Sequence, residues 1–291
     1  MNEISNVLQA SLPTPTEDSD TKVGTGAHTR LRLRVLALQV LLGVAIVGSW
    51  ELSSRLGWVD SFFYGQPSGV VSQLWDWIVN GTSQGPLWDQ ILATLKEAVY
   101  GFLLGVAVGV VFGVLLGRIR LLSDILAPYI KVANSIPRVV LASIFIISLG
   151  LGTPSKVATA FVLVFFSVFF NAFQGVREVD RNLLANARIL GANEFQLVTN
   201  VVLPSALTWI IASLHVSFGF ALVGAIVGEV LGANEGLGLM ITTAQNTFNP
   251  NGVFAGMFIL AVIALVAEAL ITALENRLIH WRPNTITEVS L

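Results

Sequence analysis

The sequence predicts an all-α membrane protein with about six transmembrane helices. Of its 291 residues, 54% are apolar and only 12% are charged, whereas soluble domains carry about 25% charged residues. The mean hydropathy is +0.75. Charged residues are absent from six long runs, and a charge in the middle of a bilayer costs several kcal/mol. These runs therefore mark the membrane-spanning segments: 35–50, 98–117, 139–155, 157–176, 195–228 and 236–267.

Net charge and cysteine content argue against two classes of function. The formal net charge is −2, and a nucleic-acid-binding protein needs a basic face. The chain contains no cysteine, so neither a disulfide framework nor a cysteine metal site can form. The three histidines stand far apart, at positions 28, 215 and 280. Because this spacing does not fit a metal site, we expect no metal.

The chain divides into a tail, a membrane domain and a second tail. Residues 1–29 are polar and carry an acidic cluster. They lack the basic and apolar regions of a signal peptide, so we expect a disordered cytoplasmic tail. The membrane domain spans 30–282, and 283–291 form a short cytoplasmic tail. A spanning helix needs about 20 apolar residues, and the six predicted helices are 33–55, 95–117, 136–151, 156–176, 205–231 and 252–276.

Basic residues predict that both termini are cytoplasmic, because positive charge concentrates in cytoplasmic loops. Thirteen of the sixteen Lys and Arg residues lie in the N-terminal tail or at the start of the first predicted helix, between the second and third or at the start of the third, between the fourth and fifth, or after the sixth. Arg118 and Arg120 follow the second helix, and Lys131 and Arg138 precede the third. The opposite, outer segments hold only Arg55, Lys96 and Lys156.

Residues 56–94 form the long segment on the outer side. This segment is rich in Trp, Phe and Tyr, which gather where the membrane meets water. We therefore expect it to lie at the interface and to contain a short helix near Ser68–Val79.

Glycine recurs at every fourth residue along the second predicted helix. This spacing places the glycines on one face, and small residues allow two helices to approach closely in lipid. The pattern therefore predicts tight packing against a neighbouring helix, either in the same subunit or across a dimer interface. The glycines are Gly101, Gly105, Gly109, Gly113 and Gly117.

The segment 177–204 interrupts the apolar sequence with a mixed polar loop, predicted to be cytoplasmic. Asp180 can cap a first short helix, and Gly191 suits a left-handed turn that closes it. Asn193 can cap a second helix. Pro204 cannot continue the hydrogen-bond ladder of that helix, so it marks the entry of the fifth span. The pattern predicts a helix–turn–helix elbow.

Apolar residues along the elbow leave two interpretations open. In the first helix, Leu183, Leu184, Ala187 and Leu190 share one face at helical spacing. An apolar face on a short exposed helix can dock into a groove of a partner protein. The same helix can instead lie flat at the membrane surface. Physical reasoning alone gives the two interpretations similar weight.

The elbow resembles the cytoplasmic loop of the permeases of bacterial ABC importers. The signature of that family is Glu-Ala-Ala, three residues, Gly, nine residues, and then Ile-x-Leu-Pro. Here the register gives Ala185, Asn186 and Ala187, then Gly191, and then Leu203-Pro204 at the matching spacing. Ala185 and Asn186 replace the first two signature residues, so the carboxylate of the family is missing here.

Three other segments carry the same resemblance. Asn134–Lys156 is similar to the third span of the family, with its Ile-Pro entry and Gly-x-Gly exit. Gly228–Ile241 is similar to the segment with Glu and Gly-Leu-Gly, and Leu278–Trp281 to the common ending. The resemblance covers residues 35–282 and points to the nitrate, sulfonate and taurine branch.

This resemblance implies the type I ABC importer permease fold in the bacterial inner membrane. Two permease subunits, expected to be identical, would form the pathway for a small anionic solute such as nitrate, a sulfonate or taurine. A binding protein would deliver the solute from outside, and a separate ATPase dimer would bind ATP and Mg. This chain would bind no cofactor itself. The residues implied to couple it to the ATPase are Ala185, Asn186, Ala187, Leu190, Gly191, Leu203 and Pro204.

Two ionisable residues fall within the fifth predicted span. His215 lies near its middle and Glu229 near its outer end, and ionisable groups inside a membrane indicate function by default. His215 is predicted to be either a contact for an anionic solute or a neutral histidine bonded to a neighbouring helix. Glu229 is predicted to lock an outer gate or to cap a turn.

The sequence contains no catalytic arrangement. A phosphate-binding loop needs Gly-Lys followed by Ser or Thr, and no lysine here follows a glycine. The chain therefore cannot supply the ATPase in that form. The alternative of a transporter driven by an ion gradient would need midplane carboxylates and repeated half-helices, which the sequence lacks in convincing form. A membrane-embedded enzyme would need a nucleophile–base pair or a metal site.

Overall fold

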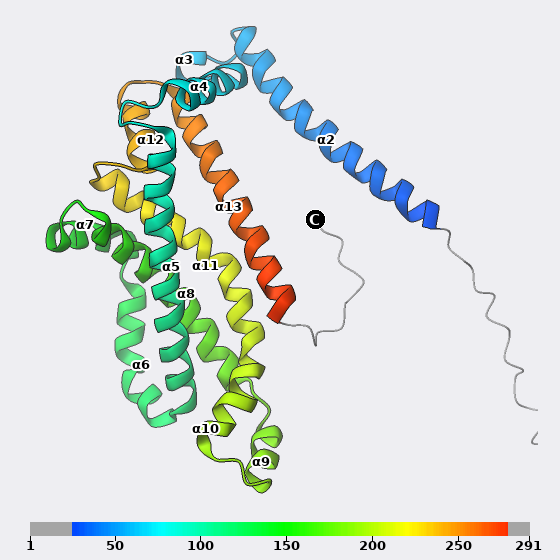
Figure 1. Cartoon of the computed structure of the whole chain (residues 1–291), viewed down its shortest axis with the longest axis vertical. Coiled ribbons are helices and arrows are strands. Elements are labelled where there is room, and N and C mark those ends of the chain that lie inside the picture. Colours follow the sequence, from blue (N-terminus) through cyan, green and yellow to red (C-terminus); the bar gives the residue numbers. More distant parts are fainter. Residues whose placement is uncertain (1–24, 279–291) are drawn as a thin grey trace, which may run out of the picture. The chain divides into compact units, whose positions relative to one another are not determined.

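The computed structural model describes residues 25–278, whose regular elements are helices (Figure 1). The chain divides into two compact units, residues 1–53 and 54–291. The predicted tails fall largely on residues 1–24 and 279–291, outside the described part. Within the described residues, five helices are long and apolar enough to cross a membrane, or six if a bent pair forms one span. The predicted all-α fold class is therefore confirmed.

The first unit holds most of α2, Thr25–Arg55. The candidate span within it, Leu33–Arg55, coincides with the first predicted helix. The helix α2 itself begins before this span, at Thr25, which lies within the predicted tail. Apolar side chains cover all sides of the span, which is typical of a helix in lipid.

The second unit opens with two short helices, α3, Ser61–Tyr64, and α4, Pro67–Asn80. α4 matches the short helix predicted for the outer segment, and proline stands at its start, where the missing N–H has no intrahelical partner in any case. Both helices pack against the last helix, α13, Pro250–Leu278. Their exposed aromatic residues are Phe62, Phe63, Tyr64 and Trp75.

The glycine stripe lies in the most extensive helix contact, between α5, Leu87–Arg118, and α8, Thr153–Arg177. A Cβ atom added to Gly113 would lie 2.6 Å from Cβ of Ala172 and 2.8 Å from the carbonyl oxygen of Phe169. The stripe therefore packs within the same chain, which decides the alternative that the sequence left open. Each glycine faces an Ala or Val, also spaced by four: Gly101–Ala160, Gly105–Val164, Gly109–Val168, Gly113–Ala172 and Gly117–Val176.

The helix predicted over 136–151 is present as α7, Arg138–Leu149, but its 12 residues are too few to cross a membrane alone. It follows another helix, α6, Arg120–Ser135, at an angle of 87°, and the bent pair together is a candidate span. The break falls at Pro137, because proline disfavours a helical conformation in the residue before it. That residue, Ile136, is extended, with φ −72° and ψ 129°. α6 runs beside α5, and α7 packs against α8.

The elbow consists of α9, Arg181–Ile189, and α10, Glu194–Leu197, and it leads into α11, Leu203–Leu231. α11 packs against α8 and α5 and carries much of the apolar core. The remaining helix, α12, Leu237–Asn246, packs against α11 and α13. In this way α5, α8 and α11 form the centre of the second unit (Figure 1).

The prediction that the second helix of the elbow ends before Pro204 is wrong. The helical path is continuous over Glu194–Leu231 and contains one π-helical turn at Val198–Val202. In this turn the N–H of Leu203 donates to the carbonyl of Val198. A proline lacks the N–H and its ring crowds the carbonyl four residues earlier. The wider π turn accommodates both effects without ending the helix.

Candidate functional site

The first helix of the elbow is capped at both ends by its own sequence. The carboxylate of Asp180 accepts a hydrogen bond of 2.8 Å from the N–H of Asn182, as predicted. At the other end Gly191 has φ +87°, in the left-handed region. Its N–H donates to the carbonyl of Arg188, and the N–H of Ala192 donates to that of Ala187, both at 3.0 Å. This pair of bonds is a complete Schellman motif.

The second helix of the elbow is fixed by a reciprocal cap. The side chain of Asn193 accepts a 2.8 Å hydrogen bond from the N–H of Gln196, and the Gln196 side chain accepts one of 2.9 Å from the N–H of Asn193. This capping box confirms Asn193 as the predicted cap and satisfies two backbone donors that would otherwise lack partners. Both turns of the elbow are therefore structurally defined.

Glu194 connects the elbow to the end of a membrane-spanning helix. One carboxylate oxygen accepts a hydrogen bond from the guanidinium of Arg118, the last residue of α5. The other lies 3.2 Å from Nη2 of Arg188 in α9. Local sequence could not indicate this contact, because Arg118 and Glu194 are far apart in the chain. The three residues tie α5, α9 and α10 together.

The apolar residues of the elbow divide between the interior and solvent. Leu184 packs against the buried cluster formed by α8 and α11, and Leu197 is fully buried. Leu190 is 86% exposed, Ile189 82% and Phe195 76%. The predicted common face of α9 is thus only partly correct, since Leu184 points inward whereas Leu183 and Leu190 are exposed. Three large apolar side chains remain uncovered around the turn at Gly191.

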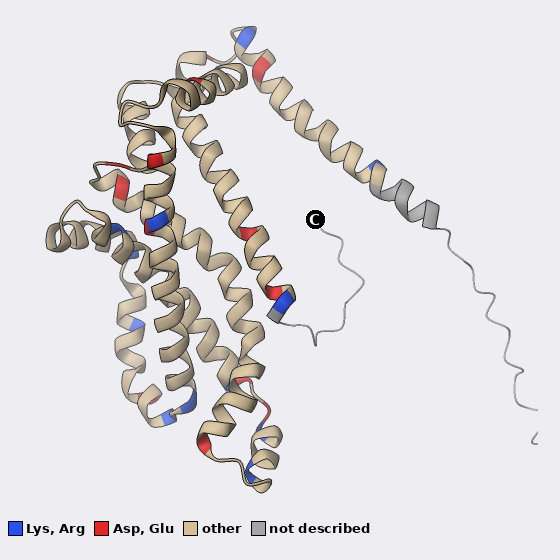
Figure 2. Cartoon of the chain, viewed as in Figure 1, with Lys and Arg blue, Asp and Glu red and all other residues tan. Residues whose placement is uncertain are grey.

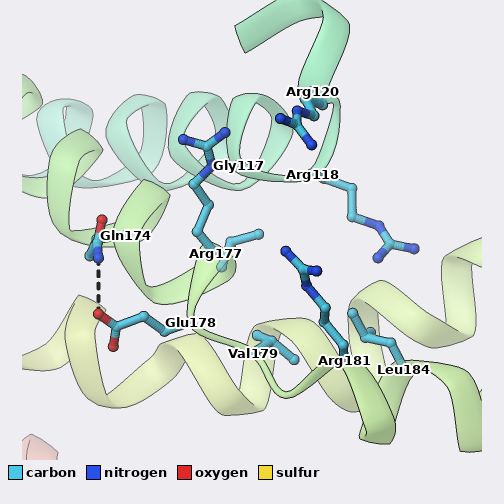
Figure 3. Close-up of a pocket in the computed structure, with 10 residues that line it drawn as sticks. Gly117, Arg118, Arg120, Gln174, Arg177, Glu178, Val179, Arg181 and Leu184 are labelled. Carbon is cyan, nitrogen blue, oxygen red and sulfur yellow. Dashed lines mark hydrogen bonds between the residues drawn. The ribbon is translucent and has the colours of Figure 1, made fainter. Parts of the chain in front are cut away.

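A basic cavity lies where α5 and α8 end and the elbow begins, at what we call the basic end. Its volume is about 550 Å³. Figure 3 shows its side chains reaching in from α5, α6, α8 and α9 and from the segment between α8 and α9. The amide of Gln174 donates to the carboxylate of Glu178 at 2.9 Å. Basic residues outnumber acidic ones in its lining, as expected for a cytoplasmic surface, and Figure 2 shows blue segments where α5, α6 and α9 meet this end. The arginines are Arg118, Arg120, Arg177 and Arg181.

His215 joins two membrane-spanning helices. Its Nδ1 lies 2.7 Å from Oε1 of Glu268, and its Nε2 lies 3.0 Å from Oε2 of Glu275. Both carboxylates belong to α13, so the imidazole bridges α11 and α13. The structure therefore brings His215 to a neighbouring helix, as one of its two predicted roles requires. Contact with an anionic solute stays a prediction, and the two carboxylates oppose it.

Glu229 is buried at the opposite end of the second unit, 1% exposed. One oxygen accepts a 2.6 Å hydrogen bond from Oγ1 of Thr94 in α5, and the other accepts a 2.6 Å bond from the N–H of Gly238 in the first turn of α12. Glu229 thus caps α12, which is one of its two predicted roles. The bond to Thr94 also ties this turn to α5.

Glycine is required where α12 meets Glu229. Gly236 has φ +115°, which side chains rarely adopt. At Gly238 an added Cβ would lie 2.8 Å from the Glu229 carboxylate. The neighbouring N–H groups of Gly236 and Leu237 are bonded to side chains of α5, at 2.8 Å each. The Gly-Leu-Gly sequence therefore allows the backbone to close over a buried carboxylate.

Two further buried ionisable residues near Glu229 were missed by the sequence analysis. Glu97 is 3% exposed and Lys156 is 1% exposed. The ammonium of Lys156 donates to the carbonyls of Leu151 and Gly152. Lys156 was assigned to an outer loop, because it stands at the end of a charge-free run. Its sequence neighbours could not show that α8 already begins at Thr153 and carries the lysine into the interior.

Comparison with known proteins identifies relatives of the membrane domain. A family model described as "Binding-protein-dependent transport system inner membrane component" matches residues 105–280. The putative aliphatic sulfonates transport permease protein SsuC of Bacillus subtilis (strain 168) is 31% identical over 243 residues, which cover 84% of this chain and 87% of that protein. The riboflavin transport system permease protein RibX of Chloroflexus aurantiacus is 32% identical over 246 residues, 84% of this chain and 90% of that protein.

A solved structure shares the fold. One chain of the MetNI methionine ABC transporter, in inward-facing conformations, superimposes with a TM-score of 0.53 at 18% identity. The match covers 66% of this chain and 94% of that chain. The predicted permease fold is therefore confirmed.

Proposed function

The chain belongs to the family of inner membrane components of binding-protein-dependent transport systems, and on this premise we propose that it carries a small anionic solute across the membrane. It is the permease of an ABC importer, a multi-pass protein of the inner membrane. It is not the ATPase, and ATP binds on the partner ATPase subunit. The family also implies a solute-binding protein as a partner. The alternatives of a gradient-driven transporter and a membrane enzyme are set aside by this assignment.

The proposal of an anionic solute is supported by the relative whose name specifies aliphatic sulfonates. The other relative is named for riboflavin, which carries no formal charge at neutral pH and is the second candidate. The charge of the solute therefore separates the two. We further propose that two copies of this chain form the pathway, because one chain presents a single elbow and the ATPase partners act as a dimer.

Uptake by the reconstituted complex tests the class of solute. The permease, its ATPase and its binding protein are placed in proteoliposomes, and uptake of ethanesulfonate and of riboflavin is compared with and without ATP. We expect ATP-dependent uptake of ethanesulfonate and none of riboflavin. Uptake of riboflavin alone would contradict the anionic proposal and favour the second candidate.

The elbow is the proposed contact with the ATPase. The observation that carries this proposal is the exposure of Ile189, Leu190 and Phe195 around one rigid turn. Large apolar side chains are costly to leave in water, and short amphipathic helices commonly place such residues in a groove of a partner. The signature positions Ala185, Asn186 and Ala187 lie on α9, the helix that ends at Ile189. Leu203 and Pro204 begin α11 and would be displaced when the elbow moves.

The connections of the elbow suit it to transmit movement. Its first helix follows α8 after three residues, and its second helix continues into α11 without an end. The carboxylate of Glu194 adds a bond to α5 through Arg118. A displacement of the elbow by the ATPase would therefore act on three membrane-spanning helices together. Because Gly191 closes the turn in a conformation that other residues rarely adopt, the two short helices would move as one body.

Leu190→Asp should weaken the association with the ATPase, because it places a charge in an apolar contact. We expect at least a tenfold loss of co-purified ATPase in mild detergent, on the order of 1.4 kcal/mol or more. Leu121→Asp is the matched control, since Leu121 is also an exposed leucine at the basic end but lies in α6. Equal recovery of ATPase with both variants would instead support an elbow that lies flat on the membrane.

A further inference from the structure

Arg138 lies near the middle of the membrane-spanning part and not at the cytoplasmic surface. It is the first residue of α7, directly after the 87° break. Its guanidinium carbon is 4.8 Å from the centre of the Phe166 ring in α8. Phe166 precedes the last residue of α8, Arg177, by eleven residues. At 1.5 Å per residue this is about 17 Å, close to half the length of the helix. The sequence analysis assigned Arg138 to a cytoplasmic loop, and the break in the helix corrects this.

The charge of Arg138 is not neutralised within residues 25–278, the part of the chain that the structure describes. Among the described residues, no carboxylate lies within ion-pair distance of its guanidinium. The groups that meet it are the side-chain oxygen of Asn134 and the face of Phe166. A guanidinium at this depth is costly in lipid, and such residues nearly always face a bundle interior or a water-filled cavity. The face that α6 and α7 present beside α8 is therefore unsuited to lipid.

A cavity begins beside Asn134 and runs toward the basic end between α6 and α8. Its volume is about 360 Å³, which lies within the range of small-molecule sites. Lys131 and Arg177 line it together with one acidic residue, Asp124, which is 4.0 Å from Arg120. The remaining surface is largely aromatic: Phe169, Phe170 and Phe173. The guanidinium of Arg177 lies over the last of these rings, 4.8 Å from its centre.

We propose that Arg138 and Asn134 form an anion-recognition point within the translocation pathway, and that the cavity between α6 and α8 is the cytoplasmic exit from it. This inference rests on the proposed import of an anionic solute. It adds that the permease itself selects for a negative charge, in addition to any selection by the binding protein. The chemical class is a small organic anion with a sulfonate-type or carboxylate head and a short apolar body.

The chemistry of the residues fits such a solute. A guanidinium presents several N–H donors in one plane, and these can bond two oxygens of one anion. The amide N–H₂ of Asn134 adds donors beside it. Phenylalanine rings along the cavity can contact an apolar body without binding it in one orientation. Lys131 and Arg177 place positive charge further along, so an anion leaving Arg138 meets another favourable position before the basic end.

Cysteine labelling tests the site without knowledge of the natural solute, because the chain contains no cysteine. Asn134→Cys in the intact complex, in inside-out vesicles without nucleotide, is treated with an anionic (2-sulfonatoethyl) and a cationic (trimethylammonioethyl) methanethiosulfonate. We expect the anionic reagent to react faster, relative to the rates of both reagents with a free thiol. Adding Arg138→Gln should lower this preference by about tenfold or more, because a nearby unit charge is removed.

Leu265→Cys, an exposed residue near the middle of α13, is the matched control and should react with neither reagent. An unreactive Asn134→Cys, or a preference that Arg138→Gln leaves unchanged, would overturn the proposal. The labelling result does not depend on the natural solute. The proposed function would fail by a different observation, an absence of ethanesulfonate uptake by the unaltered complex.

Transport gives the second measurement. Arg138→Gln should reduce uptake of ethanesulfonate at saturating binding protein by at least about tenfold, and Arg138→Lys should restore part of it because the charge returns. Recovery of ATPase should be unchanged in both variants, since Arg138 lies away from the elbow. Normal uptake by Arg138→Gln would overturn the assigned role even if the labelling preference were present.

Discussion

Gly113→Ala should destabilise the membrane domain. The new Cβ would lie 2.6 Å from Cβ of Ala172 and 2.8 Å from the carbonyl oxygen of Phe169. Neither atom can move by a rotamer change, so α5 and α8 would have to separate. Overpacking a well-packed contact costs about 1–3 kcal/mol, and the strain here would also reach the neighbouring Gly–Val contacts.

Thermal unfolding in detergent, followed by loss of the monodisperse peak, measures this effect. Gly219→Ala is the matched control, because Gly219 lies in α11 with no atom within 4 Å of an added Cβ. Alanine there should be neutral or stabilising by up to about 1 kcal/mol, since glycine is the poorer helix former. If both variants unfolded at the same temperature, the packing of the stripe against α8 would be incorrect.

Glu229→Ala should loosen the outer end of the domain. The carboxylate accepts bonds from Thr94 and from the N–H of Gly238, each 2.6 Å long. Each of these hydrogen bonds contributes about 0.5–1.5 kcal/mol, and leaving the buried N–H of Gly238 without a partner costs about 1–3 kcal/mol more. The charge of nearby Lys156 would also lose a compensating partner. We expect a loss of at least about 3 kcal/mol and the release of α12 from α5.

Limited proteolysis after α11, together with thermal unfolding, measures the release of α12. Glu235→Gln is the control, because Glu235 stands in the same turn and loses the same charge but is exposed. We expect it to behave as the unaltered chain. Rapid cleavage of both variants would argue that the charge of the turn matters and not the cap made by Glu229. Slow cleavage of both would argue that the turn holds α12 without that cap.

Several elements could be predicted from local sequence because local chemistry determines them. Charge-free runs locate the helices that cross a membrane, since a charge in lipid is costly at any position of the fold. Asp180, Gly191 and Asn193 could be assigned correctly because a helix cap depends on a few consecutive residues. The four-residue repeat of glycine also implies close packing on one face, whichever helix supplies the partner.

Other features depend on residues that are distant in the chain. The partner of the glycine stripe, the bond between Glu194 and Arg118, and the burial of Lys156 each involve two or three helices. Side-chain spacing along one helix carries no information about which neighbour it meets. The sequence therefore indicated the kind of contact for the glycines, and nothing for Glu194 beyond its position near a helix start.

The two places where the helices depart from the prediction both carry a proline. Proline appears at Pro137 and at Pro204, and its missing N–H is the same in both. At Pro137 the chain turns by 87°, whereas at Pro204 a π turn keeps the helix continuous. The sequence by itself determined the class, the spans and the capped elbow. Only the tertiary structure decided whether each proline breaks or bends a helix, because the outcome depends on distant segments: α7 packs against α8, whereas α11 packs against α8 and α5.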